Sequence, residues 1–85
     1  MMTSTNPEMG RELLAGDLMV KTVVIVGRED RPHCFTVWVW HVGEDFIAFK
    51  AGEINHILIV LRLDDGTMID ETGNRIHVWE YLGEV

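Results

Sequence analysis

The strongest constraint on the fold of this chain is a set of β-branched segments that are apolar on both faces. Successive side chains of a strand point to opposite faces. The segment 34–42 alternates between one face with Phe35, Val37 and Val39 and another with Thr36, Trp38, Trp40 and Val42. Segments 20–26 and 57–61 repeat this two-sided pattern. A sheet with two apolar faces needs a cover on each.

Glycine and acidic residues separate these segments and indicate short turns. We expect strands at about residues 18–28, 33–42, 46–50, 54–63, 67–70 and 75–82. Five or six strands joined by short turns predict a mainly β fold: a small antiparallel meander that forms an SH3-like or OB-like barrel or half-barrel. The length, 85 residues, suits one domain, which we place at residues 7–85 after a flexible tail at 1–6.

The start of the chain carries helix signals. Thr5 and Glu8 have the spacing of a capping box, Pro7 suits a first helical turn, and Gly16 suits a helix stop. These signals predict one short N-terminal helix at about residues 7–15.

A curled barrel and one short helix leave apolar sheet uncovered. Aromatic side chains bury about 150–250 Å² each and often anchor interfaces. The expected interface residues are Trp38, Trp40, Trp79 and Tyr81. The alternative is that Trp38 and Trp40 fill the barrel or lie under the helix.

The charge balance bears on partners and location. The chain has 14 acidic and 7 basic residues, a net charge of −7, which disfavours nucleic acid and anionic membranes. One cysteine, Cys34, allows no internal disulfide and favours a reducing compartment. Residues 1–7 lack the pattern of a signal peptide, and the longest apolar stretch, 57–61, is far too short for a membrane helix. We therefore expect a soluble, cytoplasmic protein.

Catalytic motifs are scarce in this sequence. Ser4 is the only serine, the glycines form no phosphate-binding loop, and Cys34 is expected to be a small buried residue. The histidines lack the close spacing of zinc ligands, and acidic pairs such as Asp64-Asp65 suit solvated turns. We expect no catalytic residues, no metal and no cofactor.

The preferred hypothesis is a small non-enzymatic module that binds proteins, self-associates as a homodimer or other homo-oligomer, and engages or regulates another protein. The alternative is a ligand-binding or enzymatic barrel with a pocket at His41 and His77, helped by Glu80 or Arg75. An acidic mimic of nucleic acid is a weaker alternative, because the acidic pairs would fall on two opposite rims of a meander.

Overall fold

The computed structural model describes residues 7–31, 33–52 and 56–84, and these residues form a β-structure with one short helical turn. The elements are β1 (Pro7–Leu13), the 3₁₀ turn η1 (Ala15–Asp17), β2 (Val23–Arg28), β3 (Cys34–Val42), β4 (Phe46–Ala51), β5 (His56–Arg62), β6 (Met68–Ile69) and β7 (Arg75–Glu84). The predicted tail at residues 1–6 lies outside the described residues.

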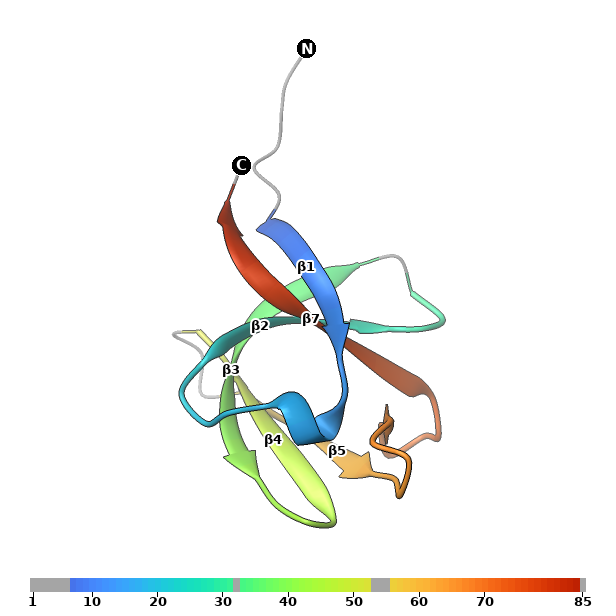
Figure 1. Cartoon of the computed structure of the whole chain (residues 1–85). Coiled ribbons are helices and arrows are strands. Elements are labelled where there is room, and N and C mark those ends of the chain that lie inside the picture. Colours follow the sequence, from blue (N-terminus) through green and yellow to red (C-terminus); the bar gives the residue numbers. More distant parts are fainter. Residues whose placement is uncertain (1–6, 32, 53–55, 85) are drawn as a thin grey trace.

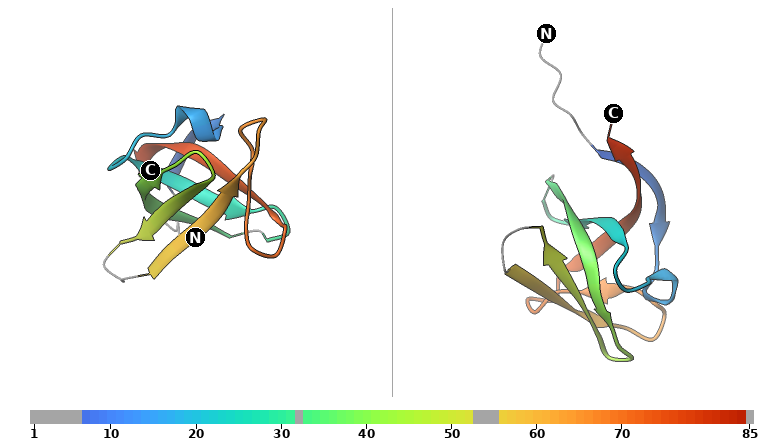
Figure 2. Two further views of the ribbon diagram at one scale, coloured as in Figure 1. Left: turned by 90° about the horizontal axis from the view of Figure 1, so that it is seen from below. Right: turned by 90° about the vertical axis from the view of Figure 1, so that its left-hand side faces the viewer.

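Strands β2 to β7 form a closed six-stranded antiparallel barrel (Figure 1). Each strand pairs with the next along the chain, and β7 returns to pair with β2. The prediction of a mainly β barrel is confirmed, and the barrel is closed. β1 is an additional strand that pairs with β7, and the two extend together beyond the barrel wall toward the chain ends (Figures 1 and 2).

The predicted N-terminal helix at residues 7–15 is wrong. Most of this segment is β1, which pairs with β7 from Pro7 opposite Glu84 to Leu13 opposite Val78. Proline is acceptable as the first residue of a strand. In the part of the chain that the structure describes, helical structure is limited to η1, where the backbone N–H of Leu14 donates to the Asp17 carboxylate at 2.9 Å. The local capping signals were outweighed by pairing with a strand 65 or more residues away along the chain.

Side chains from every strand fill the barrel. The interior cluster consists of Leu13, Ala15, Leu18, Val24, Val26, Val37, Val39, Ile47, Phe49, Val60, Met68, Ile76 and Val78. Each fully buried Val, Ile, Leu or Phe contributes about 1.5–3 kcal/mol relative to exposure. The interior is therefore filled without Trp38, Trp40 or Trp79, and the indoles belong to the outer surface.

A β-bulge in β3 sets the position of Trp40. Val39 pairs with Phe49 and His41 pairs with Ala48, so β3 has one extra residue, Trp40, between these pairs. A bulge shifts the alternation of the residues that follow it. Val42 consequently packs against the interior cluster, and its predicted place on the face of Trp38 is wrong.

Candidate functional site

The outer surface of β3, β4 and β5 carries six of the large hydrophobic side chains that are exposed among the described residues. Register places Lys50 between Trp38 and Ile57, Ala48 beside Ile59, and Phe46 beside Leu61. We call this surface the aromatic face and define it by its exposed apolar residues: Trp38, Trp40, Phe46, Ile57, Ile59 and Leu61. Trp38 is 44% exposed and Trp40 is 49% exposed.

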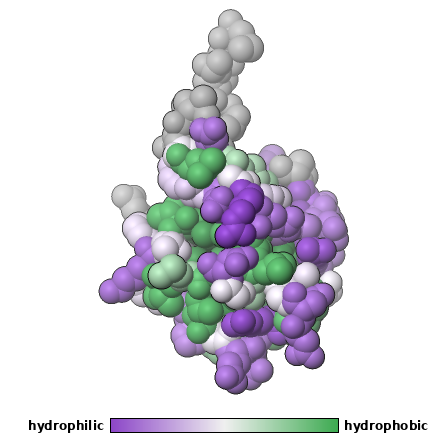
Figure 3. Space-filling model, in the orientation of Figure 1, coloured by the Kyte–Doolittle hydropathy of each residue, from purple (hydrophilic) through white to green (hydrophobic). Residues whose placement is uncertain are grey.

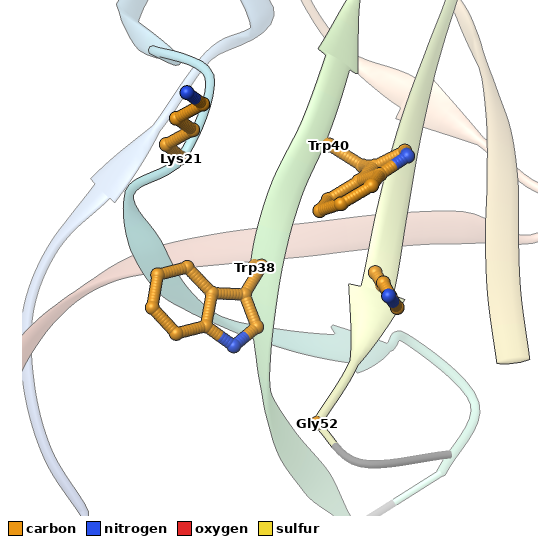
Figure 4. A pocket seen from close by; sticks show the side chains of 5 residues that line it. Lys21, Trp38, Trp40 and Gly52 are labelled. Atoms are coloured by element: carbon orange, nitrogen blue, oxygen red, sulfur yellow. The ribbon is translucent and has the colours of Figure 1, made fainter. Parts of the chain in front are cut away.

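The two indoles of the aromatic face frame a shallow groove. Trp38 and Trp40 leave β3 toward opposite sides, and Lys21, Lys50 and Gly52 complete the lining (Figure 4). The groove has a volume of about 280 Å³. Hydrogen bonds of Lys21 and Thr22 with the backbone of Val39 continue the pairing of β2 with β3 and bring Lys21 to the edge of β3.

The aromatic face differs in charge from the rest of the chain. Lys21 and Lys50 are the only lysines in the sequence, and both line the groove. The ammonium of Lys50 lies 4.5 Å from the ring centroid of Trp40, within range of a cation–π interaction. The outward positions of β3, β4 and β5 that the structure describes hold no carboxylate. Hydrophobic residues also gather on the side of the molecule where β2, β3 and β4 lie (Figure 3).

Trp79 and Tyr81, also predicted for the interface, lie on the outer surface of β7 and are half-buried. The Trp79 ring covers Gly27 of β2, where an added Cβ would be 3.2 Å from Cζ3 of the indole. Trp79 also stacks on His77, with centroids 5.7 Å apart. Ile25, its cross-strand neighbour, is 0% exposed although it faces away from the interior. Trp79 therefore packs against other residues of its own chain and is less available to a partner.

His41 and His77 are not brought together. His77 pairs with Gly27, and Gly27 pairs with Cys34, which is seven residues from His41 along β3. His41 stacks on Phe46 at 4.9 Å. The ring nitrogens of His77 contact Glu12 and Glu29.

Of the residues proposed to help this pocket, Arg75 lies 3.7 Å from Glu12, the carboxylate that His77 also contacts, and Glu80 accepts a hydrogen bond from the backbone N–H of Arg11. Arg75 therefore lies near His77, whereas His41 is on another part of the sheet.

Two of the acidic pairs each contribute one carboxylate, Asp65 or Asp70, to the hydrogen bonds of a turn. Asp70 accepts hydrogen bonds from the Thr72 hydroxyl and from the backbone N–H groups of Thr72 and Asn74. The hydrogen bond from the Thr72 hydroxyl is the largest influence that lowers the Asp70 pKa below its ordinary value. Asp65 makes equivalent bonds to Thr67, which also lower its pKa.

Cys34 is exposed, contrary to the expectation that it is buried. It lies on the outer surface beside Gly27, where an added Cβ would be only 2.9 Å from its sulfur. The outer position follows from its pairing with Gly27, which no local pattern indicates.

A second hollow lies at one end of the barrel, where the alternative hypothesis expected a pocket, but its lining includes neither His41 nor His77. It has a volume of about 960 Å³ and lies between β5 and the turn that joins β6 to β7. We call it the barrel mouth. Phe35, which points toward the barrel interior, lines it and is 65% exposed. The very short β6 is the feature that leaves this end open, and its length was not evident from the alternation pattern.

Comparisons of the chain with models of protein families, with curated proteins and with solved structures found no match. Within residues 7–31, 33–52 and 56–84, no three His, Cys, Asp or Glu side chains are grouped closely enough to hold a metal ion. In the same ranges, no helix has the length and hydropathy to cross a membrane. A function for this chain must therefore be inferred from its surfaces.

Proposed function

We propose that this protein is a non-enzymatic binding and assembly module that forms a symmetric dimer through the aromatic face and engages another protein by the same surface. The observation that carries the proposal is the exposure of Trp38 and Trp40 beside Phe46, Ile59 and Leu61 on one continuous surface. Exposed tryptophans on a rigid sheet are typical anchors of protein interfaces.

The size of the aromatic face supports a weak dimer. Its six side chains expose on the order of 500 Å², near the upper limit of the apolar patches found on monomers. A standard interface buries about 800 Å² per partner. Contact through this face and its margin should therefore produce a dissociation constant on the order of 10 µM.

Charge supports a second copy as the occupant. A chain with a net charge of −7 repels its own copies through most of its surface. The aromatic face has no outward carboxylate among its described positions and carries Lys21 and Lys50. Two copies that meet through this face keep their acidic turns at the margin, where each lysine pair attracts the carboxylates of the other copy.

The test is sedimentation velocity from about 5 to about 500 µM, which brackets the expected dissociation constant. We expect the wild-type protein to pass from monomer to dimer over this range. Trp40→Glu places a charge in the contact and should weaken dimerisation at least about tenfold. Leu82→Glu is the matched control, because Leu82 is 59% exposed on β7, away from the aromatic face. A wild-type protein that stays monomeric, or a Trp40→Glu variant that dimerises normally, would contradict the proposal.

A further inference from the structure

One stretch of β5 has backbone groups that face the barrel mouth without a strand partner. The backbone N–H of Arg62 donates to Asp45 on the β4 side, and that of Leu63 donates to Thr67 on the other side. Because these directions alternate along a strand, the N–H and C=O groups of Ile57, Ile59 and Leu61 point away from β4.

Leu61 is paired with Ile69 of β6, where the ladder ends. Ile57 and Ile59 have no pairing on this side within the described residues.

The opposite wall of the barrel mouth is a fixed turn. β6 has two residues, and the chain then turns through Asp70, Glu71 and Thr72, all of which line the hollow. The Asp70 hydrogen bonds hold this turn, and Arg28 lies 3.6 Å from Asp70. The hollow is therefore bounded by β5 on one side and by this hydrogen-bonded turn on the other.

The floor of the barrel mouth is apolar. Val37, Phe49, Leu58 and Ile76 reach it from the barrel interior, and Phe35 stands at its rim. Arg31, His33 and His56 lie around the opening. An apolar floor beside unpaired strand groups is the combination used in peptide recognition by strand addition.

We propose that the barrel mouth binds an extended peptide segment of a partner protein, which adds as a strand to β5. The peptide backbone bonds to Ile57 and Ile59. The peptide residue opposite Leu58 then points into the mouth toward Phe35 and Phe49, because side chains of directly opposed residues share a face. The site selects an apolar residue at this central position, while the residues before and after it point outward beside Ile57 and Ile59.

The shape of the hollow favours a single peptide over a second copy of the barrel. A β5 strand from another copy carries β4 along its other edge. Neighbouring strands are about 4.8 Å apart, so the second strand would meet the Asp70–Thr72 wall. This site adjoins the aromatic face, because Ile57 and Ile59 belong to both, but a strictly monomeric protein would still possess it.

The experiment begins with selection of random linear heptapeptides displayed on phage against the immobilised wild-type protein. The selected sequence is synthesised, and its affinity is measured by calorimetry. Ile57→Pro removes the N–H that faces the barrel mouth, together with part of the side chain, and leaves the hydrogen bonds between β4 and β5 intact, as proline at a strand edge does. We expect it to weaken binding at least about tenfold, with Ile57→Val as the matched variant that preserves the N–H.

Two further measurements keep the proposal testable if Ile57→Pro does not fold. Phe35→Ala should also weaken binding, whereas Leu82→Ala, far along β7, should not. Bound peptide should slow amide hydrogen exchange of Ile57 and Ile59 relative to the free protein, without affecting Leu61, which is already paired. Enrichment of no heptapeptide, or binding that is indifferent to both Ile57→Pro and Phe35→Ala, would overturn the proposal.

Discussion

Two aromatic regions of the barrel's outer surface differ in how they are covered. On β7, Trp79 lies over Gly27, stacks on His77 and adjoins the fully buried Ile25. On β3, Trp38 and Trp40 remain 44% and 49% exposed. The difference comes from the neighbouring strand: β2 offers Trp79 a glycine to cover, whereas the β4 positions beside Trp40 hold Ala48 and Lys50, which leave about half of the indole in solvent. Coverage of an aromatic strand is thus decided by its non-local neighbours.

The largest expected effect concerns stability. Trp79→Ala should lower the free energy of unfolding by about 3 kcal/mol, because it uncovers Gly27 and Ile25. Trp40→Ala should cost less than about 1 kcal/mol in the monomer, since its ring is half in solvent. Urea unfolding of dilute protein measures both. Equal losses would remove the distinction between the two regions.

A smaller difference is expected for the two histidines that accompany these regions. His77→Ala breaks contacts with Glu12, Glu29 and the Trp79 ring, and should cost about 1 kcal/mol. His41→Ala breaks only its stacking on Phe46 in the part of the chain described, and should cost less than about 0.5 kcal/mol. Thermal unfolding at neutral pH distinguishes the two. A larger loss for His41→Ala would reverse the comparison.

The smallest expected effect is the pH dependence of the free energy of unfolding. It should arise from carboxylates in the turns and not from the aromatic face, which has no carboxylate at its described positions. The Asp70 pKa is lowered by folding, so the unfolded chain binds protons more readily. The stability from this group is complete above the ordinary aspartate pKa of about 3.9 and is lost as pH falls through the folded value.

Asp70→Asn keeps an acceptor oxygen for Thr72 and Asn74 but does not titrate. Unfolding free energies measured between about pH 2 and pH 7 should therefore fall less steeply in this variant than in the wild-type protein. An unchanged acid dependence would show that the Asp70 turn does not contribute to it.

The strand content could be predicted from the sequence because β-branched runs alternate with turn residues from β2 to β7. The observed strands fall within or close to the expected ranges, although β2 begins at Val23 and not at residue 18. Lys21, which has a φ of 73°, turns the chain just before this strand. The N-terminal segment was mistaken for a helix because its partner, the end of β7, is the last strand of the chain.

The candidate site was predictable only in part. The two-sided apolar pattern left open whether Trp38 and Trp40 fill the barrel or lie outside it, and the structure leaves both side chains partly exposed. It could not show that Trp79 covers Gly27, because that contact depends on the pairing of β2 with β7. The bulge at Trp40 and the open barrel mouth also depend on register and on strand length, which alternation alone does not determine.

The most direct test of the account is the concentration dependence of the three indole N–H signals in the NMR spectrum of the wild-type protein. If a second copy covers the aromatic face, the signals of Trp38 and Trp40 shift as concentration rises, and the signal of Trp79 stays in place. Three signals that remain fixed, or a shift confined to Trp79, would contradict the claim that β3 carries the surface on which the molecule assembles.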